Sequence, residues 1–156
     1  MTQPVIIPAG HELLAPDFDA YENLTGAWAA YTPVWTTGGT APALGNGSLV
    51  GNFFQAGMLV HVRIVLTMGT TTTFGTSTYR LSLPVTPKAH SLLVAACEDA
   101  SASARWAGQA WIIAQSATGD NMRIMMPPNN NPVTNTVPFT WASADKLILA
   151  GSYEAA

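Results

Sequence analysis

The sequence predicts an all-β protein: an antiparallel β-sandwich of jelly-roll type with an extended N-terminal arm and at most one short helix. Three observations predict this class. Residues 57–69 alternate between two faces in a run rich in β-branched side chains, which is typical of a half-buried strand. Similar segments bring the expected total to about seven or eight strands, separated by glycine, proline and asparagine turns. Each has one apolar face, which favours antiparallel pairing.

The segment 57–69 is expected to be the central strand of the sheet. About ten alternating residues would span about 33 Å, against a mean strand length of about 5–6 residues. One face carries the apolar residues Val60, Val62, Ile64, Leu66 and Met68. The other face carries Leu59, His61, Arg63, Val65 and Thr67. This second face is too mixed for a deep core and too apolar for open solvent, so we expect Leu59, His61, Arg63 and Val65 to meet a partner subunit.

The first part of the chain, residues 1–26, is expected to be an anchoring arm that precedes a β-sandwich domain at 27–156. Three prolines within residues 1–16 forbid a continuous helix. Five apolar residues make this stretch too hydrophobic for a solvated tail, namely Val5, Ile6, Ile7, Leu13 and Leu14. An extended arm lying on a neighbouring subunit fits both facts, and a frayed terminus is the alternative.

The one helix that we expect covers residues 16–24. Asp17 and Asp19 suit its positive N-terminal end. Phe18 and Tyr21 fall at three-residue spacing on one face. Because a helix this short is not stable alone, we expect Phe18 and Tyr21 to dock it on a neighbour with the rest of the arm.

The domain itself is expected to begin with an extended segment at 31–35, because the residue before Pro33 is held out of the helical region. Residues 48–55 then form a strand that pairs with 57–69 as a hairpin through a turn at Ala56 and Gly57. The remaining strands are expected at 78–83, 91–96, 101–115, 121–126 and 145–153, and a loop at 127–138.

The composition indicates assembly. The chain of 156 residues is 48% hydrophobic and only 10% charged, whereas about 25% charged residues is usual. We therefore expect a permanent oligomer, and the alternative is an uncharged, threonine-rich extracellular β-domain. The net charge is −3 with no lysine or arginine cluster, which argues against nucleic acid and anionic membranes as partners. The sequence contains no apolar run of about 18 residues, so we expect no membrane-spanning helix.

Few residues are candidates for catalysis or metal binding. We therefore expect a protein that is not an enzyme and that binds no metal and no cofactor. The histidines His11, His61 and His90 lack metal-ligand spacing. The single cysteine, Cys97, lies in an apolar stretch that predicts a buried, unreactive thiol and synthesis in a reducing cytosol. The pairs of acidic residues are poor candidates for acid–base catalysis, because no apolar pocket is expected around one member to shift its pKa away from that of the other.

The tryptophans are the remaining candidates. Trp106 and Trp111 lie five residues apart, so a regular strand places them on opposite faces. We expect one in the core and Trp111 exposed, where it would stack on a sugar or pack against a neighbour. Together with the loop residues Asn129, Asn130 and Asn131, Trp111 is the candidate receptor contact. Core or interface packing is the alternative for the tryptophans.

Several phrases of the sequence occur in a familiar order: Tyr31-Thr-Pro-Val-Trp35-Thr, Asn46-Gly-Ser-Leu-Val-Gly51, the long strand leading to Thr70–Thr73-Phe74-Gly75, Leu81-Ser-Leu-Pro84, and Pro138-Phe-Thr-Trp141-Ala ahead of Tyr153-Glu154. In this order, over residues 27–154, the chain resembles β-rich domains of structural proteins from tailed bacteriophages of actinobacteria. The resemblance carries no catalytic motif.

This resemblance implies a non-enzymatic virion protein, made in the bacterial host cytoplasm and displayed on the virion surface. A fibre tip is expected to follow a long shaft, whereas a short arm precedes this domain. The first expectation is therefore a homotrimeric capsid decoration protein on the major capsid protein. The alternatives are a minor tail or fibre-tip protein that binds a host cell-surface carbohydrate, and a carbohydrate-binding module of other origin.

Overall fold

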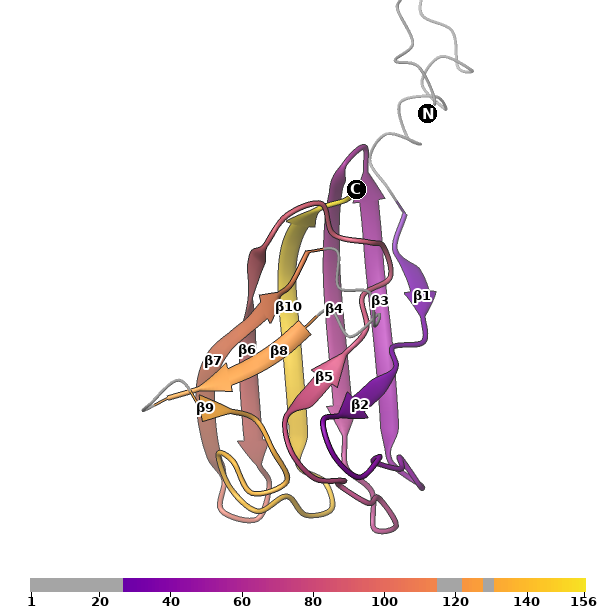
Figure 1. Ribbon diagram of the computed structural model, residues 1–156. Coiled ribbons are helices and arrows are strands. Elements are labelled where there is room, and N and C mark those ends of the chain that lie inside the picture. Colours follow the sequence, from indigo (N-terminus) through magenta and orange to yellow (C-terminus); the bar gives the residue numbers. More distant parts are fainter. Residues whose placement is uncertain (1–26, 115–121, 128–130) are drawn as a thin grey trace, which may run out of the picture.

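A computed structural model describes residues 27–114, 122–127 and 131–156. All regular elements within these ranges are strands, labelled in Figure 1: β1 (Ala29–Tyr31), β2 (Trp35–Thr37), β3 (Ser48–Ala56), β4 (Leu59–Thr67), β5 (Tyr79–Leu81), β6 (Ser91–Asp99), β7 (Ala104–Ile112), β8 (Met122–Met126), β9 (Asn131–Pro132) and β10 (Lys146–Glu154). In the described ranges no helix is long and apolar enough to cross a bilayer. The predicted arm at 1–26, with its helix at 16–24, lies outside the described residues.

The predicted all-β, antiparallel class is confirmed. The strands form one continuous sheet in the order β1-β3-β4-β10-β6-β7-β8-β5-β2, with β9 paired to β8. Every strand pair in it is antiparallel. The sheet curls, so that the short strands β8, β5 and β2 cross in front of the long ones (Figure 1). The finer assignment to a jelly-roll sandwich stays a prediction.

The curl brings the two ends of the sheet together. The end strands β1 and β2 are separated in the chain only by residues 32–34. Val34 in this link accepts a hydrogen bond from the Ser82 amide at 3.0 Å, and its own amide donates to Ser82 Oγ at 2.8 Å. These bonds extend the pairing of β2 with β5 by one residue, and the link itself joins the two end strands of the curled sheet.

The strand β4 has long partners on both sides, which confirms its predicted central position. It pairs with β3 from Ala56↔Leu59 to Ser48↔Thr67, and with β10 from Glu154↔Leu59 to Lys146↔Thr67. The predicted hairpin of β3 and β4 is also confirmed, with its turn at Gly57 and Met58. Gly57 adopts a φ of 59°, a left-handed conformation that glycine takes without strain.

The core lies inside the curl. The predicted inward face of the central strand is buried throughout, since Val60, Val62, Ile64 and Leu66 are 0% exposed and Met68 is 2% exposed. These residues join one cluster with inward side chains of β5, β6, β7, β8 and β10, including Tyr79, Leu93, Ile112, Ile124 and Leu149. A single core thus fixes which face of every long strand points outward.

Several predicted elements differ in extent from those observed, and the strand expected at 101–115 covers only Ala104–Ile112 as β7. The strand expected at 78–83 is shorter in the structure, where β5 covers Tyr79–Leu81 and Ser82 makes one further bond to Val34 beside β2. The strand expected at 91–96 extends to Asp99, because β6 stays paired with β7 up to Asp99↔Ala104. The loop expected at 127–138 contains β9, where Asn131 pairs with Met126 at the edge of β8.

Candidate functional site

The outer face of the long strands carries the predicted interface residues. Leu59 is 50% exposed, Arg63 is exposed, and His61 and Val65 are half-buried. All four project from β4 away from the core, as the alternation predicts. The structure separates them into two environments, because Val65 belongs to an apolar region and His61 and Arg63 line a hollow.

The apolar region crosses the sheet in register. Val50 on β3 pairs with Val65 on β4, which pairs with Ile148 on β10, which pairs with Ala96 on β6. Paired residues of antiparallel strands share a face, so these four side chains form a row across four strands. The row continues onto Val94 and Leu92 of β6. We call these six residues the outer strip: Val50, Val65, Leu92, Val94, Ala96 and Ile148.

The outer strip is substantially exposed. Val94 is 69% exposed, and Val50 and Leu92 are each 51% exposed. The solvated face of an antiparallel sheet is usually polar. A contiguous apolar face on a folded domain marks an interaction surface.

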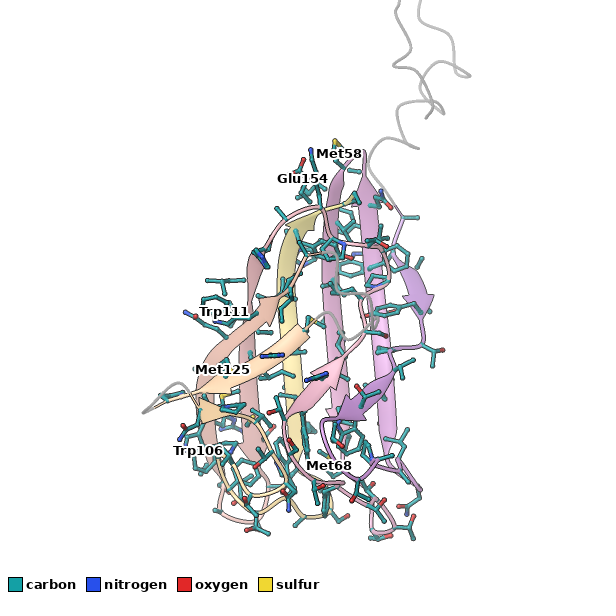
Figure 2. All side chains as sticks on the ribbon, viewed as in Figure 1. Met58, Met68, Trp106, Trp111, Met125 and Glu154 are labelled. Carbon is teal, nitrogen blue, oxygen red and sulfur yellow. The ribbon has the colours of Figure 1, made fainter. Side chains whose placement is uncertain are left out.

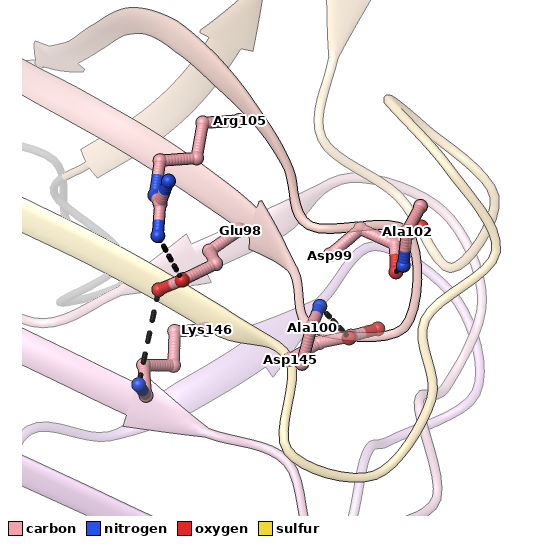
Figure 3. Close-up of polar contacts among 7 residues, drawn as sticks. All are labelled: Glu98, Asp99, Ala100, Ala102, Arg105, Asp145 and Lys146. Atoms are coloured by element: carbon pink, nitrogen blue, oxygen red, sulfur yellow. Dashed lines mark hydrogen bonds and ion pairs between the residues drawn. The ribbon is translucent and has the colours of Figure 1, made fainter.

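Charged residues border the outer strip at one end and are already paired with one another. Glu98 Oε1 lies 2.7 Å from a guanidinium nitrogen of Arg105, and its Oε2 lies 3.8 Å from Lys146 Nζ (Figure 3). Because these charges have partners within the chain, the strip presents an almost uncharged surface.

A hollow of about 380 Å³ adjoins the strip above β3 and β4. Trp28, Asn52, His61, Arg63 and Ala150 line it. The register places Asn52 opposite Arg63 across the hairpin, and Arg63 opposite Ala150 on β10. We call it the Trp28 hollow.

Two aromatic rings that line the Trp28 hollow, those of Trp28 and His61, form a cluster with the ring of Phe54. The Trp28 ring meets the rings of Phe54 and His61 edge to face, with centroids 5.3 and 5.6 Å away. The Phe54 and His61 rings stack at 5.5 Å. His61 Nδ1 lies 2.8 Å from Ser152 Oγ on β10. The cluster therefore orients both the indole and the imidazole.

A second hollow, of about 240 Å³, lies above β7 and β8. Trp111, Ile113, Arg123 and Met125 line it. Trp111 and Arg123 are register partners, and Trp111 stands out from the ribbon while Met125 lies further along β8 (Figure 2). Each hollow thus combines an exposed tryptophan with an arginine.

The two tryptophans of β7 lie on opposite faces, as predicted. Trp106 is half-buried and packs on Phe139 with ring centroids 4.8 Å apart, whereas Trp111 is 47% exposed. The structure does not bring Trp111 together with Asn131. Asn131 pairs with Met126, whose side chain faces inward, while Trp111 shares the outer face with Arg123. Asn129 and Asn130 lie outside the described residues.

Groups that often carry chemistry are isolated. In the described part of the chain, no three histidine, cysteine, aspartate or glutamate side chains gather to hold a metal. Cys97 is fully buried, and this burial raises the pKa of its thiol to about 12. The predicted burial of Cys97 is confirmed.

Trp28, Asn52 and Phe54 were not predicted as site residues. Part of the signal was present, because pairing across the predicted hairpin places Asn52 beside Arg63 and Phe54 beside His61. The approach of Trp28 depends on β1 pairing with β3, which local patterns do not determine. Comparison of the chain with protein-family models, curated proteins and solved structures finds no match.

Proposed function

We propose that this chain is a non-enzymatic structural protein of a bacteriophage virion, a homotrimeric capsid decoration protein that docks on the major capsid protein. The resemblance of residues 27–154 to phage structural domains supports the virion setting. The outer strip is the observation that carries the assembly role. A jelly-roll sandwich remains our proposal for the fold type, supported by the crossing of β8, β5 and β2 in front of β10, β4 and β3 (Figure 1).

The occupant that we propose for the outer strip is a second copy of the chain. Complete burial of a valine or leucine side chain contributes about 1.5–3 kcal/mol, and side chains already half-buried contribute about half of that. The strip carries no charge, and Glu98, Arg105 and Lys146 at one end of it are paired with one another. Three copies of the strip that meet around a three-fold axis would therefore bring uncharged side chains together, with the exposed Arg63 beside Val65 left at the border. The composition, with only 10% charged residues, favours the same arrangement.

The head location is tested on virus particles. We expect antibodies against this chain, detected with gold particles in electron microscopy, to label heads uniformly. Labelling confined to the tail would contradict the decoration role and favour the tail-tip role below.

The arm at 1–26 is a separate part of the proposal. Deletion of residues 1–24 is expected to strip the protein from particles, because the apolar residues of this segment are proposed to anchor it. Unchanged occupancy on purified particles would contradict the anchoring role without bearing on the outer strip.

A minor tail or fibre-tip protein that binds a host carbohydrate is the second candidate. The second hollow favours it, since exposed Trp111 offers a stacking surface beside the hydrogen-bond donors of Arg123. Binding of the purified chain to host cells, lost in Trp111→Ala, is expected if this candidate is correct. Tail labelling together with such binding would select it.

A further inference from the structure

The Trp28 hollow is built from groups that recognise a sugar ring and an anion together. Its volume of about 380 Å³ falls in the range of about 300–1,000 Å³ that is usual for small-molecule sites. Trp28 is 56% exposed and is held edge to face by Phe54 and His61. A tryptophan fixed in this way offers a pre-ordered apolar surface for the C–H face of a sugar.

The polar groups of the hollow are mainly donors. Arg63 and Asn52 lie opposite one another across the hairpin. Their side chains have no hydrogen-bond or ion-pair partner in the described part of the chain. A guanidinium presents five N–H donors in a planar fork that matches a carboxylate or phosphate. The amide of Asn52 both donates and accepts, which suits a sugar hydroxyl. Because the Nδ1 of His61 is bonded to Ser152, its Nε2 remains for a ligand.

The charge of the hollow is complementary to an anion. Among its described lining residues Arg63 carries a positive charge and there is no carboxylate. Glu154, which is on the same face of β10 as Ser152, is bonded to Lys88 at 2.6 Å. Among the described residues of the hollow, an anionic ligand would therefore meet an arginine and no carboxylate.

We propose that the Trp28 hollow binds a sugar ring that carries an anionic substituent, either the carboxylate of a uronic acid or a phosphate ester. The ring stacks on Trp28, the anion accepts a bidentate hydrogen bond from Arg63, and Asn52 and His61 bond ring hydroxyls. This site goes beyond the proposed assembly role and does not depend on it, since it involves a different set of side chains from the outer strip.

The test is an NMR titration of the full chain with four probes: methyl glucuronide, a hexose phosphate, methyl glucoside and inorganic phosphate. We expect saturable shifts of the Trp28 indole and Asn52 amide signals with an anionic sugar, in the millimolar range typical of a single sugar ring. Uncharged methyl glucoside is expected to bind at least about tenfold more weakly, because it lacks the charge-assisted bonds. Saturation by the glucuronide or by the hexose phosphate identifies the carboxylate or the phosphate as the natural anion.

Matched variants locate the binding. Arg63→Gln is expected to weaken the anionic sugars about tenfold or more and to leave methyl glucoside unchanged, and Trp28→Ala is expected to weaken all sugars. The control is Val34→Ala, at a 58% exposed valine that lines neither hollow, and it is expected to change nothing. Both Arg63 and Trp28 are exposed, so the variants should fold, and their amide spectra check this.

Several results would overturn the proposal: absence of saturable binding to any sugar probe, equal affinity for methyl glucoside and the anionic sugars, or equal affinity for inorganic phosphate and the sugar phosphate. Unchanged affinity in Arg63→Gln, or loss of binding in Val34→Ala, would overturn it as well. None of them bears on the oligomeric state, so failure of this proposal is distinguishable from failure of the proposed assembly.

Discussion

Asp145 is a buried aspartate that links the ends of β4, β6 and β10 through its side chain and its backbone. It is 1% exposed. Its Oδ1 accepts the Ala100 amide at 2.9 Å, just beyond β6 (Figure 3), and its Oδ2 accepts the Ala142 amide at 2.6 Å. Its own carbonyl accepts the Met68 amide at 2.9 Å, just beyond β4. Asp145 therefore holds the loops at this end of the sheet in place.

Asp145→Ala is expected to lower the free energy of unfolding by about 2–4 kcal/mol, because it removes both acceptors and leaves two amide donors without partners. Asp145→Asn keeps one acceptor oxygen and is expected to lose less. Urea denaturation followed by tryptophan fluorescence measures both. Equal stability of the alanine variant and the wild type would contradict this role.

Cys97 predicts a specific dependence of stability on pH. Burial raises the pKa of its thiol to about 12, whereas an exposed thiol ionises near about 8.5. The folded state therefore keeps a proton that the unfolded state releases, so the contribution is full below the unfolded pKa and is lost as pH rises. Between about pH 8.5 and 10 we expect the free energy of unfolding to fall by up to about 1.4 kcal/mol per pH unit.

Urea denaturation at several pH values checks this slope, and Cys97→Ala should remove it. In the same pH range the native thiol should not react with a disulfide reagent that modifies it at once in urea. A native thiol that reacts at the rate of the unfolded one would contradict the buried position. Above about pH 10 the buried tyrosines add a dependence of the same sign, since burial also raises the pKa of Tyr31, Tyr79 and Tyr153.

At the scale of single residues, the alternation along each strand correctly predicts which side chains point toward the core and which point away from it. It placed Ile64 inward, Val65 outward, and Trp106 and Trp111 on opposite faces, because the period of two is a property of the strand backbone itself. It did not place Trp28 against His61, since that contact joins separate strands. His61 and Arg63 were expected at a subunit interface, and the geometry groups them in a hollow with Asn52.

At the scale of elements, β4 is the strand on which the sheet is built. It is hydrogen-bonded along its length to both β3 and β10, and its inward face is fully buried. The outward face bears little of the core packing. Neighbouring positions on this strand should therefore differ strongly in their effect on stability.

Ile64→Ala is expected to lower the free energy of unfolding by about 2–5 kcal/mol through lost burial and a residual cavity. The matched change Val65→Ala, one residue along on the outer face, is expected to cost within about 1 kcal/mol when measured on the monomer. Chemical denaturation at low protein concentration gives both values. Similar losses for the two variants would contradict the assignment of the faces.

Sequence patterns do not predict the order of the strands in the sheet. The hairpin of β3 and β4 was predictable because its turn is local. The insertion of β10, the last strand in the chain, between β4 and β6 depends on contacts between distant segments. The strand β9 was predicted as loop because asparagine and proline are typical of turns, yet it pairs with the edge of β8.

At the scale of the whole molecule, one curled sheet presents two different surfaces side by side. The outer strip crosses β3, β4, β10 and β6 and is apolar, whereas the Trp28 hollow above β3 and β4 is aromatic and cationic. The curl encloses the core and leaves these outer surfaces as broad faces on which partners can act. We therefore assign assembly to the strip and ligand recognition to the hollow.

Val94→Lys is expected to break the assembly, because it places a charge on the outer strip at its most exposed residue. The control is Val34→Lys, the same change at a 58% exposed valine in the link between β1 and β2, away from the strip. Sedimentation should show subunits dissociated in the first variant and the wild-type assembly in the second. Equal behaviour of the two variants would exclude the strip as the interface.

The mass of the full wild-type protein in solution, measured by light scattering at micromolar concentration, tests the proposed homotrimer most directly. We expect one species at about three times the chain mass of 16.4 kDa, because the outer strips of three copies are proposed to be buried against one another around a three-fold axis. A single stable species at 16.4 kDa would contradict it.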